Sequence, residues 1–411
     1  MNAFINFRFP RTGVGGTVGR RGWLLGLLLS VAAPVPAASP FTPTDPGQVL
    51  ETLPLQAADP QLRELRGLRQ RLADRPDDVE LALWVARRNL EIGRAEADPR
   101  YYGYAQAALA PWWSQPAPPP EVLVLRAVLR QNRHDFDAAL ADLRQALALQ
   151  PRHPQAWLNQ AVIHQVRGEP AEALKSCLAL RRLSGALLFN ACASGALGRG
   201  GQAGFAYDSL RRALEREVDA DAATRLWALT VLAEIAEQRG DAQAAEQHFR
   251  AALSLNRRDV YLLGAYADFL LAQNRPAEAR ELLADERRAD ALVLRLALAQ
   301  RRLNDPDWQR HAALLEARFA AARQRGEDTH AAAEARLRLD LRQQPGEALT
   351  LAQRNWAKGQ REPQDARLLL EAALAARQPE AAREVLDWLA RVKLEDQRLT
   401  ELSRRLREFP S

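Results

Sequence analysis

The sequence predicts an all-α protein, built as a solenoid of stacked helical hairpins. Ala, Leu, Arg, Glu and Gln dominate the 411 residues, and these residue types favour helices. Runs rich in Val, Ile and Thr, which would indicate strands, are missing. A spacing of 34 residues recurs between alanines, as Ala127/Ala161, Ala139/Ala173, Ala233/Ala267 and Ala245/Ala279. Such a period marks a helix–turn–helix unit that stacks on copies of itself, and arrays of this kind bind other molecules more often than they catalyse reactions.

The N-terminal segment has the pattern of a secretory signal peptide. Arg20 and Arg21 precede the apolar run 23–33, and small residues follow at 35–37. Basic, apolar and small-residue regions in this order predict a signal over 1–37, cleaved near Ala37–Ala38. An uncleaved anchor is the alternative, but eleven residues fall short of the roughly 20 that a spanning helix needs. We expect a periplasmic or secreted protein without stable membrane insertion after cleavage; Sec and twin-arginine export both fit the paired arginines.

The mature chain divides into four segments by composition and periodicity. A region rich in Pro, Thr and Asp predicts an extended linker over 38–60. Helical hairpins follow over 61–120, a core array over 121–288, and a less regular helical region with a capping helix over 289–411. In the last region, the pattern predicts one hairpin from 312–325 and 329–342, and another from 348–358 and 366–377.

Two copies of the repeat carry a resemblance to a known family. Trp157, Ala161, Gly168 and Ala173 lie in one copy, and Leu229, Ala233, Gly240, Ala245, Phe249 and Ala252 occupy corresponding places in another. These residues resemble the tetratricopeptide repeat family. The resemblance implies a right-handed α-solenoid whose concave groove is lined by the first helix of each hairpin. It also implies a protein or peptide partner, with the chain acting as a scaffold or assembly factor.

The same resemblance identifies candidate groove residues. They are Val124, Val128, Gln131, Leu158, Asn159, Val162, Gln165, Thr230, Glu234, Glu237 and Asp268. Co-chaperone members of the family hold a C-terminal carboxylate with lysine and arginine, which this lining lacks, although Asn159 matches one polar member of that clamp. The apolar half suits a helix or an extended peptide, and the acidic half near Glu234 suits a basic segment.

The two cysteines, Cys177 and Cys192, are 15 residues apart and fall on successive predicted helices. In an oxidising compartment such a pair is a disulfide candidate. The alternative is two buried, reduced cysteines that pack as small apolar side chains. The spacing does not fit a redox Cys-x-x-Cys motif.

Charge and motifs exclude several function classes. Without the four arginines of the first 37 residues, basic residues exceed acidic ones by only about two, which gives no argument for a nucleic-acid partner. The six histidines lack metal-ligand spacing, and neither a phosphate-binding glycine loop nor a nucleophile elbow is present. We expect no enzyme activity, with no catalytic, metal or cofactor-binding residues.

Adjacent tryptophans, Trp112 and Trp113, lie in a proline-rich segment. They are a candidate exposed aromatic platform for a peptide or carbohydrate, or they pack beneath the proline-rich loop. With Tyr101 and Tyr102 they support the alternative function, an accessory factor in envelope polysaccharide processing or export that contacts glycan.

Overall fold

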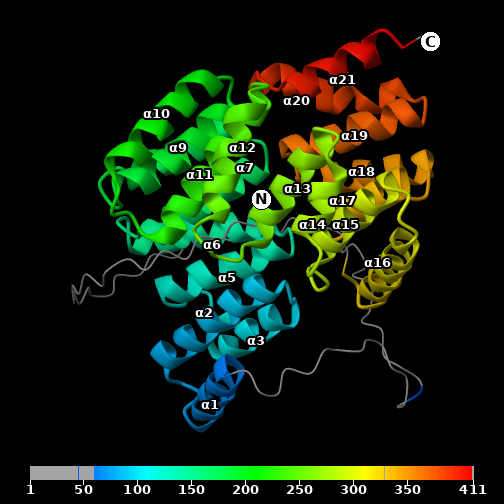
Figure 1. Cartoon of the computed structure of the whole chain (residues 1–411). Coiled ribbons are helices and arrows are strands. Elements are labelled where there is room, and N and C mark those ends of the chain that lie inside the picture. The colour runs from blue at the N-terminus through cyan, green and yellow to red at the C-terminus, as the bar shows by residue number, and fades with distance from the viewer. Residues whose placement is uncertain (1–44, 46–59, 328, 410–411) are drawn as a thin grey trace, which may run out of the picture.

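The computed structural model describes residues 45, 60–327 and 329–409, and within these ranges every regular element is a helix (Figure 1). The signal peptide expected at 1–37 and nearly all of the linker expected at 38–60 lie outside the described residues. None of the described helices is long and apolar enough to cross a membrane. The helices are α1 (Pro60–Asp74), α2 (Val79–Glu96), α3 (Arg100–Ala108), α4 (Ala110–Trp113), α5 (Pro120–Asn132), α6 (Phe136–Leu149), α7 (Pro154–Val166), α8 (Pro170–Leu180), α9 (Ala186–Arg199), α10 (Ala203–Arg216), α11 (Ala222–Gln238), α12 (Ala242–Leu253), α13 (Val260–Ala272), α14 (Pro276–Leu282), α15 (Asp290–Arg302), α16 (Asp307–Gln324), α17 (Ala331–Asp340), α18 (Pro345–Ala357), α19 (Pro363–Ala375), the 3₁₀ helix η1 (Pro379–Ala382), α20 (Arg383–Val392) and α21 (Gln397–Arg407).

Local sequence sets where these helices begin and end. Asp221 and Asp259 precede α11 and α13, and each carboxylate accepts hydrogen bonds from backbone N–H groups of the first helical turn. The turns within successive hairpins need a left-handed residue. Gly168, Gly201 and Gly240 supply it, with φ of 67°, 77° and 79°.

Consecutive helices pair into antiparallel hairpins, and the hairpins stack side by side. The pairs are α2/α3, α5/α6, α7/α8, α9/α10, α11/α12, α13/α14, α15/α16 and α17/α18. The first helix of each hairpin also contacts the first helix of the next, from α2 through α5, α7, α9, α11, α13, α15 and α17 to α19. This continuous inner layer makes the molecule an α-solenoid.

The repeated alanines explain how the hairpins close. All eight alanines that show the 34-residue spacing are 0% exposed. A methyl side chain lets two helix backbones approach closely, and larger neighbours such as Phe249 fill the space between hairpins. The core is therefore a series of local clusters, each shared by neighbouring hairpins, rather than one central core.

The C-terminal third continues the array, but its helices pair differently from the sequence prediction. Helix α16 pairs with α15, and α17 pairs with α18, whereas α16 and α17 make only slight contact. The expected hairpin of 312–325 with 329–342 is therefore wrong. The prediction passed over 290–302 as a first helix, so 312–325 was assigned to the wrong partner. The second expected hairpin, of 348–358 with 366–377, corresponds to α18 and α19, which do pack against each other.

Candidate binding groove

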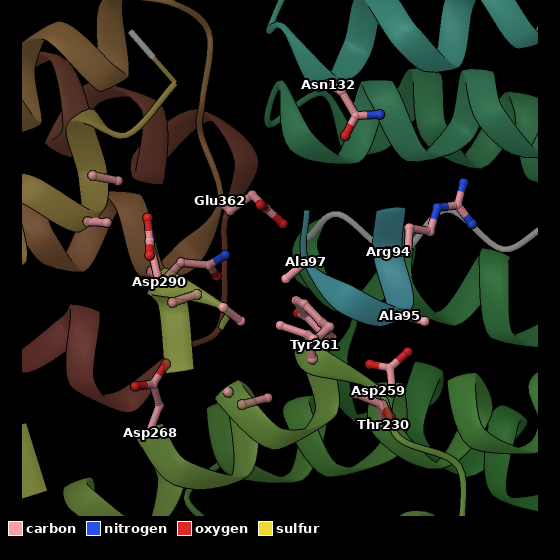
Figure 2. A pocket seen from close by; sticks show the side chains of 18 of the residues that line it. Arg94, Ala95, Ala97, Asn132, Thr230, Asp259, Tyr261, Asp268, Asp290 and Glu362 are labelled. Carbon is pink, nitrogen blue, oxygen red and sulfur yellow. The ribbon is translucent and has the colours of Figure 1, made fainter. Parts of the chain in front are cut away.

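The inner layer of the solenoid surrounds a cavity of about 3320 Å³. Its walls come from helices far apart in the sequence, including α2, α11, α13, α15, α17 and α19. Figure 2 shows Glu362 projecting from one side of this space, Arg94 and Ala97 on another, and Tyr261 and Thr230 below them. Pockets for small molecules are usually about 300–1,000 Å³, so this space is large enough for part of a macromolecule.

The curvature of the solenoid brings its early and middle hairpins together at one end of the cavity. The guanidinium of Arg258, in the loop before α13, donates a hydrogen bond to the carbonyl oxygen of Ala95, at the end of α2. Ala97 packs against the hydrophobic cluster that includes Leu263 and Leu292. These contacts bound the cavity on the side of the first hairpins.

Ion pairs within and between hairpins border the cavity. Arg295 on α15 makes a bidentate pair with Asp268 on α13, with N–O distances of 2.9 and 2.5 Å. Further pairs link Arg318 to Asp290 at 2.6 Å, Arg336 to Glu371 at 2.5 Å and Arg258 to Glu286 at 2.5 Å. Arginines and acidic residues are present in nearly equal numbers in the lining. The wall is thus charged but largely self-neutralised, and it does not form the basic channel that a nucleic acid would need.

Two glutamates on α11 lie deeper in the wall. Glu234 accepts a hydrogen bond from the Tyr261 hydroxyl, and burial raises the pKa of Glu234. Glu237 pairs with Arg398 of α21 at 2.9 Å. Burial raises the pKa of Glu237 to about 7, against the opposing attraction of Arg398 and Arg367. Because burial favours the neutral form of a carboxyl, Glu237 titrates near neutral pH.

The structure divides the eleven candidate groove residues into two sets. Thr230, Glu234, Glu237 and Asp268 belong to the cavity lining. The other seven are at most 3% exposed and do not line the cavity: Val124, Val128, Gln131, Leu158, Asn159, Val162 and Gln165. Their side chains pack between hairpins, because the inner helices α5 and α7 contact each other and their partners closely. Contrary to the expectation, this apolar half of the groove is not presented to a partner.

The tryptophan pair does not form an exposed platform. Trp112 is 9% exposed and packs in the cluster with Leu109, Val122 and Leu125. Trp113 is half-buried, and its carbonyl oxygen accepts a hydrogen bond from the guanidinium of Arg126. The proline-rich segment is therefore held against α5, and its indoles stabilise the fold.

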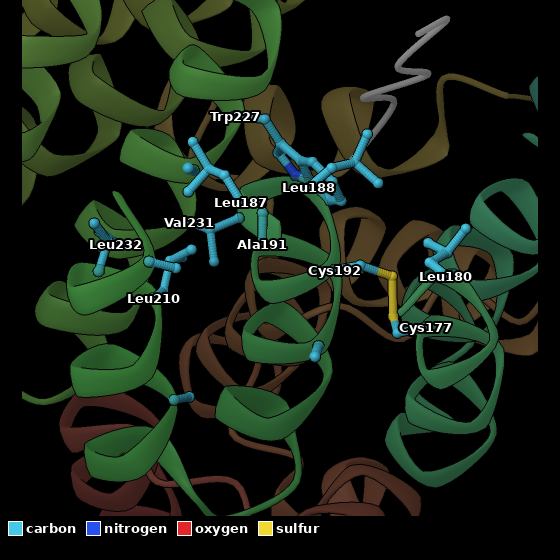
Figure 3. Packing of buried hydrophobic residues seen from close by; sticks show 14 of the residues in the cluster. Cys177, Leu180, Leu187, Leu188, Ala191, Cys192, Leu210, Trp227, Val231 and Leu232 are labelled. Carbon is cyan, nitrogen blue, oxygen red and sulfur yellow. A yellow bond between two sulfur atoms is a disulfide. The ribbon is translucent and has the colours of Figure 1, made fainter. Parts of the chain in front are cut away.

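Cys177 on α8 and Cys192 on α9 form a disulfide, with their Cα atoms 5.6 Å apart (Figure 3). Both residues are 0% exposed and lie in a cluster with Leu180, Leu187 and Ala191. The bond joins the second helix of one hairpin to the first helix of the next. It therefore fixes one step of the stack covalently.

Several lining residues were missed in the sequence, among them Arg94, Arg295, Arg336, Glu362 and Glu371. A usable signal exists for some of them. Acids and arginines that pair across neighbouring hairpins recur 27 or 28 residues apart, as in Asp268/Arg295 and Arg258/Glu286. Asp290 and Arg318, also 28 apart, pair within one hairpin. No group of three or more metal-ligating side chains occurs within the described ranges.

A stack of helical hairpins around a concave cavity defines the class of helical-repeat solenoids. Tetratricopeptide repeat models match residues 124–186 and 236–303, which overlap the regions of strictest 34-residue spacing. These two stretches of the chain are tetratricopeptide repeats. Repeats of this family generally mediate protein–protein interaction and typically act as scaffolds without catalysis.

Solved structures with a similar arrangement share little sequence with this chain. The anaphase-promoting complex hetero-tetramer Cut9–Hcn1 is 14% identical with a TM-score of 0.47, over 81% of this chain and 64% of that chain. A tetratricopeptide repeat protein from Parabacteroides merdae is 14% identical with a TM-score of 0.36; the match covers 76% of this chain and 99% of that chain. Human IFIT1, solved as a dimer with m7Gppp-AAAA, is 13% identical with a TM-score of 0.46; the match covers 81% of this chain and 86% of that chain. This chain thus spans less than two thirds of the length of the first of these. No curated protein matches the sequence.

Proposed function

We propose that this protein is an exported, non-catalytic scaffold that binds a segment of a polypeptide partner inside its central cavity, as an assembly or adaptor factor. The observation that carries the proposal is the cavity of about 3320 Å³, which the inner helices line. An extended or helical segment is a common occupant of a groove formed by helices. The self-paired charges of the wall favour a segment of mixed charge over a polyanion.

Support for export comes from two independent features. The N-terminal sequence has the basic, apolar and small-residue order of a cleaved signal. The disulfide between Cys177 and Cys192 fits an oxidising compartment such as the periplasm, because cytosolic thiols are kept reduced. Isolation of the protein from the periplasm with a new N-terminus near Ala38 would support the proposal, and a cytosolic protein that retains residues 1–37 would contradict it.

The alternative occupant, a glycan, has weaker support than the sequence suggested. The sequence analysis named four aromatic residues for glycan contact, two tryptophans and two tyrosines. Trp112 is buried, and of the four only Tyr101 and Tyr102 line the cavity. Glycan binding that is lost on Tyr101→Ala substitution would favour the accessory role in envelope polysaccharide processing over the polypeptide-binding role.

A matched pair of variants tests the use of the cavity. Ala291 lies at the start of α15, is exposed and lines the cavity. Ala171 lies at the start of α8, is also exposed, and is absent from the lining. Ala291→Trp narrows the cavity and should abolish recovery of a partner in pull-downs under native conditions, whereas Ala171→Trp should leave it unchanged. Equal recovery with both variants would place the partner elsewhere on the molecule.

A further inference from the structure

The C-terminal end of the chain runs back across the turns of four successive hairpins. The turn residues are His134, Gly168, Gly201 and Gly240, all with positive φ. Residues of the segment 358–398 meet these turns in sequence order. Gln360 bonds the His134 ring at 2.7 Å, Arg361 and Trp388 reach the turn at Gly168, Lys393 covers Gly201, and Gln397 covers Gly240. Figure 1 shows α19, α20 and α21 together at one end of the chain, near α7 and α12.

Most of the contacts involve the backbone of the turns. The Arg361 N–H donates to the carbonyl oxygen of Val166 at 2.8 Å, and the Trp388 indole donates to that of Gly168 at 3.0 Å. The Gln397 amide donates to the carbonyl oxygen of Arg239 at 3.0 Å. In the reverse direction, the N–H of Ala203 donates to the Glu395 carboxylate at 3.0 Å. These bonds satisfy backbone groups at helix ends, which otherwise need water or a cap.

The turns are shaped to admit this segment. A Cβ atom placed on Gly168 would lie 2.6 Å from the Trp388 indole nitrogen and 2.8 Å from Arg361 Cβ. A Cβ on Gly201 would lie 2.6 Å from the Lys393 carbonyl oxygen. Close approach of the C-terminal segment therefore requires glycine at both turns, in addition to the requirement set by positive φ.

The contact is polar, and it is separate from the hydrophobic cores. The cluster of the C-terminal region, which contains Trp356 and Val385, draws its members from 332–406 alone. The clusters beneath the contacted turns contain no residue of that region. Lys393, Glu395 and Gln397 are exposed although they touch the turns. The interface consists of hydrogen bonds and two ion pairs, Arg398–Glu237 at 2.9 Å and the more buried Arg199–Glu362 at 3.4 Å. It shares no hydrophobic cluster with the hairpins that it contacts, and such polar interfaces between parts of a chain are expected to move.

The same segment forms a wall of the cavity. Gln360, Glu362, Arg367, Asp396 and Arg398 all line it, opposite residues of α2 and α13. We propose that the C-terminal region 332–406, which packs as one hydrophobic cluster, acts as a latch. Its segment 358–398 covers one side of the cavity by hydrogen bonds to the hairpin turns, and the region opens as a unit to admit a polypeptide segment. This inference rests on the proposed function, since it gives the route by which the partner enters.

The latch is tested with the full-length mature protein and without any partner. The latch variant is Trp388→Phe/Gln397→Ala/Arg398→Gln, which removes three donors and keeps an aromatic ring at 388. The control is Gln309→Ala/Arg310→Gln on α16, which changes the same adjacent pair at exposed positions outside the cavity lining. A cysteine at Ala291 reports on the cavity and a cysteine at Ala171 on the outer surface, each labelled with a maleimide carried on a large polymer.

In the closed state the polymer should label the cavity cysteine slowly and the outer cysteine rapidly. The latch variant should raise the rate at 291 by at least about tenfold, because each lost hydrogen bond raises the open population about fivefold. The rate at 171 and the helical circular dichroism should stay unchanged, the radius of gyration from X-ray scattering should increase, and the control should behave as wild type. Unchanged labelling at 291 and an unchanged radius of gyration in the latch variant would overturn the proposal.

Two further measurements keep the test decisive if the triple variant does not fold. The milder Gln397→Ala/Arg398→Gln variant leaves Trp388 in place and should raise labelling at 291 by at least about fivefold, since it removes the Gln397 hydrogen bond and also the Arg398 ion pair. In wild type, high salt should weaken the Arg398–Glu237 pair and also speed labelling at 291, while slow labelling at every salt concentration would contradict the latch. A latch that stays closed while Ala291→Trp still abolishes partner recovery would overturn this inference alone.

Discussion

The indole nitrogen of Trp388 donates a hydrogen bond to the carbonyl oxygen of Gly168, at 3.0 Å, across 220 residues of sequence. Gly168 is the left-handed turn residue between α7 and α8, and Trp388 lies on α20 at the far end of the chain. Trp388 is also packed edge-to-face against Trp356, with ring centroids 5.3 Å apart. The turn at Gly168 therefore serves two purposes: it connects the two helices of its own hairpin, and it contacts the C-terminal segment.

Replacement of this glycine should therefore cost more than the loss of a left-handed turn. Gly168→Ala adds a methyl group 2.6 Å from the Trp388 nitrogen, whereas Gly359→Ala, at φ of 83°, meets nothing nearer than Phe136 Cδ2 at 3.7 Å. Both variants should lose about 1–2 kcal/mol from the positive φ. Gly168→Ala should lose about 1–3 kcal/mol more from overpacking, measured by urea unfolding. Equal losses would show that the C-terminal contact does not constrain this turn.

The raised pKa of Glu237 predicts a pH dependence of stability. Its pKa of about 7 exceeds its ordinary value of 4.5, so its contribution is fully present below about pH 4.5 and is lost as pH rises through 7. Burial is the first cause, with Asp268 and Asp396 adding repulsion and Arg398 and Arg367 opposing it. The free energy of unfolding should fall by about 1–3 kcal/mol from this group between pH 5 and pH 8. Glu237→Gln should remove that slope, and an unchanged slope in the variant would contradict this assignment.

The disulfide should stabilise the stack measurably. It closes a loop of 15 residues, for which the chain-entropy model gives about 3 kcal/mol. Cys177→Ala/Cys192→Ala should lose about this much in chemical denaturation, and a reducing agent should destabilise wild type but leave the variant unaffected. Titration of two free thiols in the unfolded, unreduced protein would show that the bond does not form.

A buried ion pair between α5 and α6 should be sensitive to the loss of one partner. Arg126 and Asp142 make a bidentate contact at 3.0 and 2.7 Å, with side chains only 7% and 3% exposed. An unpaired buried carboxylate costs about 3–5 kcal/mol, and Arg126→Met should destabilise the protein by less than this, because Arg130 still pairs with Asp142 at 2.8 Å.

Two controls separate this effect from general loss of charge. Arg126→Met/Asp142→Leu should recover most of the lost stability, since an apolar pair of similar volume replaces the ions. Arg404→Met, which breaks an exposed pair with Glu401, should change stability by less than about 1 kcal/mol. A double variant as unstable as Arg126→Met alone would argue against this explanation.

The fold was predictable because the repeat period acts locally. Ala139 packs in a cluster whose buried members, from Leu123 to Val166, all lie less than one repeat away from it, so the spacing in the sequence carries the information about the contact. The pairing of α15 with α16 escaped prediction because an apolar helix such as 290–302 offers no local sign of which neighbour it contacts. Only the packing of the whole array decides whether α16 pairs with α15 or with α17.

The candidate site was predictable only in part. Candidates were chosen because they lie on the first helix of a hairpin. Asp268 is one of those that line the cavity, whereas Val128 and Gln165 are buried where hairpins meet. Which inner residues remain accessible depends on the curvature of the stack, which no residue spacing encodes. The contact of Trp388 with Gly168 is equally invisible in the sequence, since a single hydrogen bond over 220 residues leaves no periodic signal.

The most direct test of the binding scaffold is site-specific photo-crosslinking in the native host. A benzophenone amino acid is placed at Ala291, in the cavity, or at Ala171, on the outer surface, two exposed positions on first helical turns. We expect the probe at 291 to form a discrete covalent adduct with a polypeptide, identified by mass spectrometry, and the probe at 171 to form none. The same adducts from both positions, or adducts from 171 alone, would contradict binding within the cavity.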